Sequence, residues 1–397
     1  MTITIIGLDG DALPPGAAEA LRTARRVYGS RRHLRAVPIP RSATRSELVT
    51  VDRSALAELN ERGEAVLLAS GDPGFFGIVR IVRELGVAPR VLPALSSVAT
   101  AFARIGRSWD DVAVVSAHGR ELGPAVNVCR ARAATAVLTA PGAGPAEIGA
   151  ALAGWPRTLV VAERLGERAE RVVTIDAADA GSREWDPLNV VLCLRDPDSV
   201  PARGWYAGGE PVPPPGGWAL PEDAFDHRAG MITKAEVRAV ALARLAPRPG
   251  ALIWDVGAGS GSVAVECARL GAAALAVERR PDDAERIAAN AATHGVEVRV
   301  VPGEAPAVLA GLPVPDGVFV GGGGPEVVTA VAAAGPARVV VALAALDRIA
   351  PTRAALLAAG YRVDGVQLAA SQLSTLPDGA VRLAGTNPIT IVWGGRY

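Results

Sequence analysis

The stretch Leu252-Ile-Trp-Asp-Val-Gly-Ala-Gly-Ser-Gly-Ser-Val-Ala-Val-Glu266 decides the fold of the second half of the chain. An apolar run typical of a buried strand ends at Asp255, and glycines follow at positions 257, 259 and 261. A helix is predicted to begin near Ser262. Glycines at alternate positions let the backbone approach a ligand closely, and the amide groups of the next helix point toward it. The stretch therefore predicts a strand, a ligand-binding loop and a helix of an α/β sheet.

The spacing of these glycines separates two kinds of ligand. A dinucleotide loop needs Gly-x-Gly-x-x-Gly/Ala, and position 262 is serine. Gly-x-Gly-x-Gly after a strand ending in aspartate instead resembles the class I S-adenosylmethionine (SAM) methyltransferases. The resemblance implies SAM contacts at Asp255, Gly257, Ala258, Gly259, Ser260 and Gly261. A purely structural glycine turn is the alternative interpretation.

Two further acidic residues extend this pattern. Glu278 ends the next predicted strand, 21 residues after Gly257, where a carboxylate can accept hydrogen bonds from both ribose hydroxyls. Glu304, within Gly303-Glu-Ala305, follows the third strand, where such enzymes contact the adenine. A solvated loop carboxylate is the alternative for Glu304.

The segment Ala229-Gly-Met-Ile-Thr-Lys-Ala-Glu-Val-Arg238 precedes this region. Thr233 with Glu236 three residues later fits a capping box at a helix start. Lys234 is the only lysine among 41 basic residues. Because arginine is used everywhere else, a compact ammonium is expected to have a role there, and we treat Lys234 as a candidate catalytic residue. Chance retention is the alternative.

Several stretches of residues 217–397 together resemble the decarboxylating precorrin methylases of cobalamin biosynthesis. They are Gly230–Arg238, Trp254–Ser262, Ala276–Arg279, Gly303–Pro306 and Pro315–Gly324. The resemblance places Thr233, the glycine loop, Glu278 and the 303–305 turn around SAM. It places a glycine-rich loop on the substrate side, comprising Gly321, Gly322, Gly323 and Gly324.

The first half of the chain carries different motifs, each after a predicted strand. They are Ile6-Gly-Leu-Asp-Gly10, Ala69-Ser-Gly-Asp-Pro-Gly-Phe-Phe-Gly77 and Pro93-Ala-Leu-Ser-Ser97. Strand ends of an open α/β sheet are where ligands bind, although ordinary turns and helix caps would look the same. In this order the motifs resemble the tetrapyrrole (corrin and porphyrin) methylases over residues 1–196, which implies two α/β lobes with SAM between them. The implied SAM contacts are Gly7, Gly71, Asp72, Pro73, Ser96 and Ser97.

Two other features of the first half bear on the substrate. His118, in Ser116-Ala-His-Gly-Arg120, resembles the branch of that family that methylates a precorrin at C5, so a catalytic or substrate-contacting role and a structural one both stay open. A run of arginines fits a solvated helix face or, alternatively, the steering of a substrate with many carboxylates. These arginines are Arg22, Arg25, Arg26, Arg31, Arg32 and Arg35.

The predicted fold class is α/β, with a two-lobed N-terminal domain and a class I Rossmann-like C-terminal domain. Residues 197–216 are predicted to link domains at 1–196 and 217–397, because residues 195–221 hold seven prolines and five glycines. We also expect helices at Ala17–Val27 and Ala146–Leu152. The expected strands are Ile3–Ile6, Ala65–Ser70, Val112–Ser116, Ala136–Thr139, Leu159–Ala162, Val190–Leu194, Leu252–Val256, Ala274–Glu278, Val298–Val301, Gly317–Val320 and Val339–Leu343.

Composition narrows the function classes. The 397 residues carry 41 basic and 41 acidic side chains, which argues against a nucleic-acid partner. No apolar run is long enough to span a membrane, and the N-terminus lacks a basic leader, so a cytoplasmic enzyme is expected. The scattered cysteines and histidines predict no metal site. Ala-rich helices and an apolar edge at Val339–Leu343 would permit a homo-oligomer.

Two methyltransferase-like halves on one chain resemble fused precorrin methyltransferases that methylate C5 and C15 and remove CO2 from the C12 acetate, with one SAM per domain. Two alternatives stay open. One is a methyltransferase pair acting on another tetrapyrrole or on a cobalt-loaded intermediate. The other is a non-catalytic, two-site SAM sensor or scaffold.

Overall fold

The computed structural model describes residues 3–10, 13–48, 65–200, 207–208, 216–228 and 230–396. The chain forms two compact units. The first consists of Met1–Arg120, Ala134–Ala151 and Arg157–Ala207, and the second of Glu121–Ala133, Leu152–Pro156 and Gly208–Tyr397. Most of the predicted linker, residues 201–206 and 209–215, lies outside the described residues, so the linker stays a prediction.

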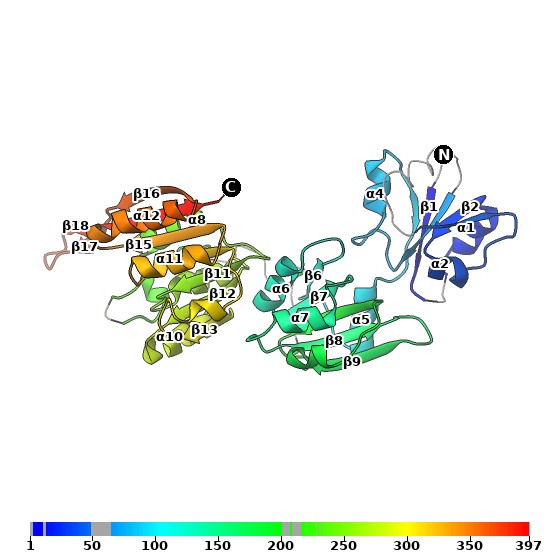
Figure 1. The fold of residues 1–397 in the computed structure, drawn as a ribbon, viewed down its shortest axis with the longest axis horizontal. Coiled ribbons are helices and arrows are strands. Elements are labelled where there is room, and N and C mark those ends of the chain that lie inside the picture. The colour runs from blue at the N-terminus through cyan, green and yellow to red at the C-terminus, as the bar shows by residue number, and fades with distance from the viewer. Residues whose placement is uncertain are drawn as a thin grey trace. The chain divides into compact units, whose positions relative to one another are not determined.

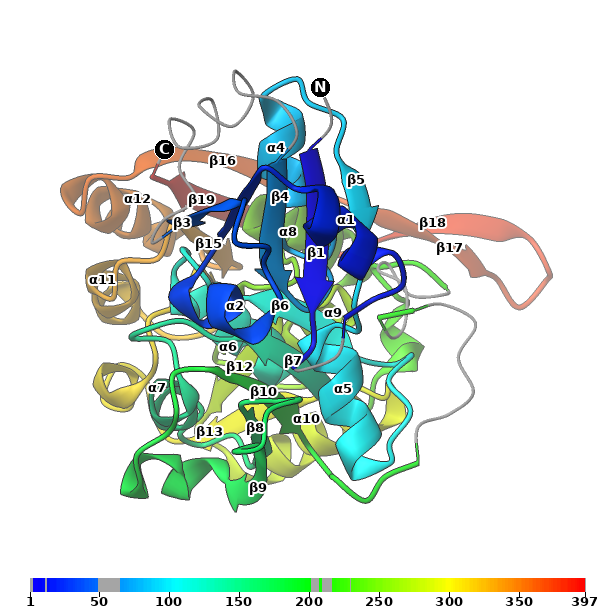
Figure 2. The same cartoon turned by 90° about the vertical axis from the view of Figure 1, so that its right-hand side faces the viewer.

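The N-terminal lobe of the first unit is a parallel sheet of order β3-β2-β4-β1-β5. β1 and β4 lie side by side in its centre, with α1 and α2 beside the sheet (Figure 2). Apolar β-branched residues make β1 a buried strand, in which Ile5 and Ile6 are fully buried. The elements are β1 (Ile3–Leu8), α1 (Ala17–Thr23), β2 (Arg26–Gly29), α2 (Arg31–Ala36), β3 (Thr44–Glu47), β4 (Ala65–Ser70), α4 (Val79–Glu84) and β5 (Arg90–Leu92).

The predicted helix Ala17–Val27 is wrong in its last four residues. α1 ends at Thr23, and the chain pairs as β2 from Arg26, where Val27 lies opposite Val66 of β4. Pairing with a neighbouring strand thus overrides the helical pattern of the preceding residues. The arginine run is consequently divided among α1, β2 and α2, and it does not form one helix face.

The second lobe of the first unit is a mixed sheet of order β6-β7-β10-β8-β9. Only the β6–β7 pair is parallel. Ser96 caps the helix α5 by accepting a hydrogen bond from the Ala99 N–H. The elements are α5 (Ser97–Ile105), β6 (Ala113–Ser116), β7 (Ala134–Leu138), α7 (Pro145–Ala151), β8 (Thr158–Glu163), β9 (Arg171–Asp176) and β10 (Asn189–Leu194).

The second unit contains a seven-stranded sheet of order β13-β12-β11-β14-β15-β19-β16, and β17 pairs with β18 as a separate hairpin. β11 to β15 are parallel, and β19 runs antiparallel to both of its neighbours. The strands are β11 (Leu252–Val256), β12 (Ala273–Glu278), β13 (Val298–Pro302), β14 (Gly317–Val320), β15 (Arg338–Leu343), β16 (Arg362–Leu368), β17 (Ser371–Thr375), β18 (Val381–Gly385) and β19 (Ile389–Gly395). The helices are α6 (Leu122–Ala131), α8 (Ala235–Leu245), α9 (Ser262–Arg269), α10 (Pro281–Thr293), α11 (Pro325–Ala333) and α12 (Ile349–Ala358).

Helices cover both faces of this sheet (Figure 1). Trp254 of β11 packs in a cluster with α11 and α12, whereas its neighbour Ile253 packs in another with α8 and α9. Successive strand residues therefore face opposite apolar layers, which is why these strands are almost continuously apolar.

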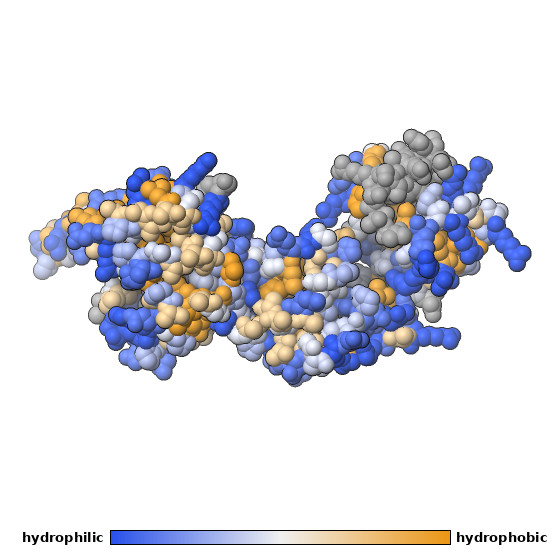
Figure 3. Space-filling model, viewed as in Figure 1, coloured by the Kyte–Doolittle hydropathy of each residue, from blue (hydrophilic) through white to orange (hydrophobic). Residues whose placement is uncertain are grey.

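The expectation of an apolar sheet edge at Val339–Leu343 is wrong. These residues belong to β15, which is hydrogen-bonded to β14 on one side and to β19 on the other. The strand is interior because β19 returns antiparallel beside it, a pairing between residues distant in sequence. Exposed large apolar side chains of the second unit include Leu373, Val381 and Leu383 of the β17–β18 hairpin, and apolar residues also reach the surface on the face that Figure 3 shows.

The described residues contain neither a membrane-spanning helix nor a cluster of metal-ligating side chains. No helix among them is long and apolar enough to cross a membrane. Within the same residues, no group of three or more histidine, cysteine, aspartate and glutamate side chains is placed to hold a metal ion.

Candidate functional site

A cavity of about 650 Å³ lies at the carboxyl ends of β11 and β14 in the second unit. The chain order of the strands reverses between β11 and β14, and ligands of open α/β sheets bind at such a switch point. The walls come from the glycine loop, the segment before α8, the end of β14 and the loop before β19. The predicted site residues among them are Thr233, Lys234, Gly257, Ala258, Gly259, Ser260 and Gly321.

The backbone of the glycine loop explains its composition. Gly257, Gly259 and Gly261 have φ of 70°, 55° and 72°, a region that favours glycine. A Cβ at Gly257 would lie 2.9 Å from the Gly322 nitrogen, and one at Gly261 would lie 2.8 Å from Ile287. The loop is therefore packed tightly against the loop after β14 and against α10, and glycine is required for this packing.

The Glu278 carboxylate connects the end of β12 to the glycine loop. Its Oε2 accepts a hydrogen bond from the Gly259 N–H at 2.8 Å, and its Oε1 accepts one from the Arg280 N–H at 3.0 Å. The side chain is largely buried, with 7% of the residue exposed. These contacts hold a negative charge beside the loop, although Glu278 itself does not line the large cavity, and its contact with a ribose stays a prediction.

Asp255 lies under the loop and does not line the cavity. It is buried at the end of β11, and its Oδ2 accepts a hydrogen bond from the Ala264 N–H at 3.0 Å in α9. Burial raises the pKa of Asp255 to about 7, and the nearby Glu278 charge adds to this effect. Asp255 therefore supports the start of α9, and no direct ligand contact follows from its position.

We expect Asp255→Asn to remove a pH dependence of stability. The carboxyl ionises near pH 7 when folded but near pH 4 when unfolded, so the folded state binds more protons between these values. The contribution of Asp255 to the unfolding free energy therefore falls as pH rises from about 4 to 7. Asparagine keeps an acceptor for the Ala264 N–H. The unfolding free energy of the variant, measured by denaturant titration, should exceed that of the wild type by a few kcal/mol above pH 7. A difference that stays constant from pH 5 to 8 would contradict this.

Thr233 and Lys234 reach the cavity from the segment before α8, but the predicted capping box does not form. Lys234 occupies the N-cap position, without a side-chain cap, so Thr233 lies one residue too early. The Thr233 carbonyl instead accepts a hydrogen bond from Arg238 at 2.6 Å. The Lys234 ammonium donates to Glu222 Oε2 at 3.0 Å. A buried arginine, rather than a threonine hydroxyl, therefore fixes this segment.

The 303–305 turn lies apart from this cavity. Gly303 and Glu304 line a neighbouring depression with Arg279 and Arg280, and neither lines the large cavity. The Glu304 carboxylate is exposed and pairs with the Arg279 guanidinium at 3.3 Å. Ala305, beside it, is only partly exposed. The Glu304 carboxylate is therefore open to solvent, and its contact with the adenine stays a prediction.

The glycine-rich loop after β14 lies between two hollows. Gly321 lines both the large cavity and an adjoining one of about 310 Å³, and the adjoining cavity is also lined by Gly322, Gly323 and Gly324. Arg348 lies in the wall of the second hollow and donates to the Gly323 carbonyl at 2.8 Å. The loop is therefore positioned next to the glycine loop and close to a cation.

The first unit has a smaller cavity, of about 120 Å³, between its two lobes. Of the six predicted residues of this unit's cofactor site, Gly71 and Ser97 line it. Gly7 does not line the cavity and lies behind the Gly71 backbone. A Cβ at Gly7 would be 2.2 Å from the Gly71 carbonyl oxygen. Asp72 accepts a hydrogen bond from the Gly74 N–H at 2.8 Å and so closes the Gly-Asp-Pro turn with Pro73. Ser96 acts as the α5 cap. These four residues support the cavity wall.

His118 is not brought to this cavity. It lies in the loop after β6, is exposed, and its N–H donates to Ser116 Oγ at 3.3 Å. Its position leaves the substrate-contacting role a prediction.

Sequence reasoning missed several lining residues. In the second unit, Gly385, Thr386 and Asn387 reach the cavity from the loop between β18 and β19, more than 120 residues from the glycine loop. In the first unit, Arg32, Ser70 and Asn189 were missed. No local motif marks these residues, apart from Ser70 in the Ala69–Gly77 motif and Arg32 in the arginine run.

Both halves match known families. Residues 3–181 match the model of the tetrapyrrole (corrin/porphyrin) methylases, and residues 223–377 match that of the precorrin methyltransferase domain. A protein of Salmonella typhimurium named cobalt-precorrin-7 C(5)-methyltransferase is 31% identical over 185 residues, which cover 43% of this chain and 88% of that protein.

Longer relatives cover both halves. A protein of Sinorhizobium sp named precorrin-6Y C(5,15)-methyltransferase [decarboxylating] is 40% identical over 337 residues, 82% of this chain and 79% of the relative. A protein of Mycobacterium tuberculosis (strain CDC 1551 / Oshkosh) with the same name is 34% identical over 342 residues, 81% of this chain and 80% of the relative. The chain belongs to the family of the decarboxylating precorrin-6Y C(5,15)-methyltransferases.

Proposed function

We propose that this chain is the precorrin-6B C5,15-methyltransferase (decarboxylating) of cobalamin biosynthesis. It transfers two methyl groups from SAM to the precorrin macrocycle and removes CO2, which gives precorrin-8. The observation that carries the proposal is the presence of two separate cavities, each at strand ends within one methylase-like half of the chain. We assign C5 methylation to residues 1–196, C15 methylation with decarboxylation to residues 217–397, and a linker to residues 197–216.

The large cavity of the second unit fits SAM, which supplies the transferable methyl group. The left-handed glycines let the loop backbone come close to the ligand, and Glu278 offers a carboxylate to its ribose. Thr233 and Ser260 add hydroxyl groups to the wall. These residues bind and orient the donor, and alignment of the reacting groups can contribute about 7–11 kcal/mol to catalysis.

The substrate side of this cavity contains the cations expected for a polycarboxylate. Lys234 and Arg228 line the cavity itself, and Arg348 lines the hollow that shares Gly321 with it. We assign Lys234 to a carboxylate neighbouring the one that leaves as CO2. A cation paired with the leaving carboxylate would stabilise the ground state and slow its loss. The electron pair of the broken C–C bond passes into the macrocycle.

Replacing Lys234 with alanine should slow the second unit's reaction about 10- to 100-fold, because one hydrogen bond to a charged group contributes about 1.5–3 kcal/mol. C5 methylation of a C15-methylated substrate should stay unchanged. Both rates are measured by product mass, with Lys234→Arg as the charge-preserving control. Equal rates in Lys234→Ala and wild type would contradict the role, and so would a substrate complex with Lys234 bonded to the C12 acetate.

In the first unit, we propose that a second SAM binds between the two lobes. Gly71 and Ser97 contact it directly, while Gly7, Asp72, Pro73 and Ser96 shape the surrounding turns. His118 is a candidate contact for the substrate.

The experiment that tests the function is the mass of the product after the purified chain is incubated with precorrin-6B and SAM. A gain of two methyl groups with loss of one CO2 is the expected result. A single methylation with CO2 loss would restrict the proposal to the second unit. An unchanged substrate with intact SAM binding would overturn the proposal in favour of another tetrapyrrole, a cobalt-loaded intermediate or a SAM sensor.

A further inference from the structure

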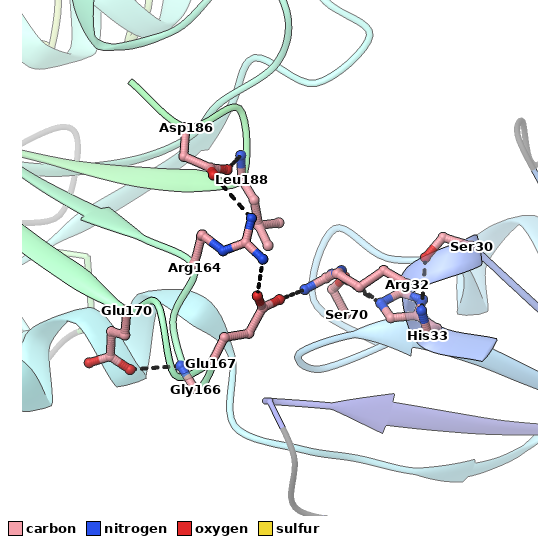
Figure 4. Close-up of polar contacts among 10 residues, drawn as sticks. All are labelled: Ser30, Arg32, His33, Ser70, Arg164, Gly166, Glu167, Glu170, Asp186 and Leu188. Atoms are coloured by element: carbon pink, nitrogen blue, oxygen red, sulfur yellow. Dashed lines mark hydrogen bonds and ion pairs between the residues drawn. The ribbon is translucent and has the colours of Figure 1, made fainter. Parts of the chain in front are cut away.

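The cavity of the first unit has one cationic side chain among its described lining residues, Arg32 of α2. Arg32 donates through Nη1 to Glu167 Oε1 at 2.8 Å. Glu167 lies in the loop between β8 and β9, on the other lobe of this unit, so the contact joins the two lobes (Figure 4). An arginine at a cavity wall is a ready partner for a carboxylate, because its planar fork of donors matches two oxygens.

The Arg32 guanidinium is held in place by groups of its own lobe. Its Nη2 donates to Ser70 Oγ at 2.9 Å and lies 3.1 Å from His33 Nε2. Burial lowers the pKa of His33 to about 4, so this imidazole is neutral at pH 7 and its Nε2 can accept from the guanidinium. Arg32 therefore keeps its position when its contact with Glu167 is broken, which is the preorganisation that a binding group needs.

The Glu167 carboxylate is also paired with a second cation, Arg164. Its Oε2 accepts from Arg164 Nη2 at 2.5 Å, and Arg164 in turn donates to Asp186 Oδ2 at 3.1 Å (Figure 4). Hydrogen bonding to Arg32 and Arg164 lowers the pKa of Glu167, so it is ionised at neutral pH. If Glu167 loses Arg32, its carboxylate is still paired with Arg164. The free-energy cost of replacing Glu167 on Arg32 by a ligand carboxylate is therefore small.

We propose that Arg32 binds a carboxylate of the ligand in this cavity and that Glu167 competes with that carboxylate for the guanidinium. The proposal rests on the proposed function, because both SAM and a precorrin carry carboxylates. The carboxylate belongs either to the amino-acid end of the methyl donor or to an acidic side chain of the tetrapyrrole, and the chemistry of recognition is the same. Arg32 is then a binding residue of the first unit, and Glu167 tunes its affinity.

The test compares three variants of the full chain. Arg32→Gln removes the cation, Glu167→Gln removes the competitor, and Arg31→Gln is the matched control. Arg31 is the neighbouring arginine of the same helix, is exposed, pairs with Glu47 at 3.1 Å and does not line the cavity. Calorimetry measures binding of S-adenosylhomocysteine, and of 5′-methylthioadenosine, which lacks the carboxylate. Initial rates of C5 methylation on a C15-methylated substrate give KM and kcat for each ligand.

The signs of the effects decide the proposal. If the methyl donor supplies the carboxylate, Arg32→Gln weakens S-adenosylhomocysteine binding about tenfold or more, leaves 5′-methylthioadenosine unchanged, and Glu167→Gln strengthens S-adenosylhomocysteine binding. If the tetrapyrrole supplies the carboxylate, Arg32→Gln raises the KM of the tetrapyrrole and Glu167→Gln lowers it. Binding of S-adenosylhomocysteine by the second unit's cavity stays the same in all three variants and serves as the internal reference.

Three results would overturn the proposal. One is Arg32→Gln without effect on either ligand. The second is that Glu167→Gln weakens binding as Arg32→Gln does. This result would mean that the Arg32–Glu167 ion pair only holds the two lobes together. The third is Arg31→Gln matching Arg32→Gln, which would reduce the effect to general charge. If the wild type fails to methylate C5, the proposed function fails, while the calorimetric comparison still decides the role of Arg32.

Discussion

Arg238→Met is expected to lower the free energy of unfolding of the second unit by about 3–5 kcal/mol, because it removes one partner of a fully buried ion pair and leaves Glu266 only the more distant Arg269, at 3.8 Å. Arg238 and Glu266 both have side chains with 0% exposure, and the Arg238 Nε donates to Glu266 Oε1 at 2.9 Å. Glu266 also accepts hydrogen bonds from the Ala219 and Leu220 N–H groups, each at 2.7 Å.

The Arg238–Glu266 ion pair connects the segment before α8 to α9. Arg238 donates to the carbonyls of Leu220 and Thr233, and its guanidinium lies 4.8 Å from the centre of the Phe225 ring. Thr233 and Lys234 reach the large cavity from the far end of the same segment. We therefore expect the variant to weaken SAM binding as well as stability.

Hydrogen–deuterium exchange of peptides covering residues 217–245 measures the local effect, and denaturant titration measures the global one. Arg22→Met is the control, because Arg22 pairs with Glu19 on the exposed surface of α1 in the first unit. Unchanged exchange and an unchanged unfolding midpoint in Arg238→Met would show that the buried pair does not hold this segment.

Glu278→Ala is expected to weaken SAM binding by the second unit about 10- to 100-fold. A hydrogen bond to a charged group contributes about 1.5–3 kcal/mol, and each 1.4 kcal/mol is a factor of ten in affinity. The substitution also leaves the Gly259 and Arg280 N–H groups without their acceptor, so the glycine loop loses a contact that shapes it.

Calorimetry with SAM measures the affinity, and product mass from precorrin-6B measures the reaction. C15 methylation and CO2 loss should fall together, while C5 methylation of a C15-methylated substrate persists. Glu278→Gln, which keeps an acceptor oxygen but no charge, should fall between wild type and alanine. Wild-type affinity in both variants would mean that the ribose is bound elsewhere.

Local signals in the sequence were sufficient for the elements that carry the second unit's site. The predicted strands Leu252–Val256 and Gly317–Val320 have the observed bounds, as does Ala65–Ser70 in the first unit, and a helix follows the glycine loop at Ser262. These features depend on neighbouring residues, because strand burial, a left-handed glycine turn and a helix start are each set within a few positions.

Features that depend on contacts between residues distant in sequence could not be predicted from the sequence. The residues after Thr23 became β2 because a neighbouring strand was available, and β15 became interior because β19 returns beside it. Thr233 lost its predicted capping role because Lys234 stands at the N-cap position and Arg238 binds the Thr233 carbonyl. In each case a tertiary contact replaced the outcome that the local pattern favoured.

The sequence by itself determined the α/β class, the glycine loop and the acidic residue at the end of the next strand. Only the tertiary structure decided that Asp255 lies beneath the loop, that Glu304 pairs with Arg279, and that Arg32 meets Glu167 across 135 residues of chain. The physical reason is that burial and charge pairing depend on which surfaces meet after folding, whereas turns and strand ends depend on the backbone preferences of adjacent residues.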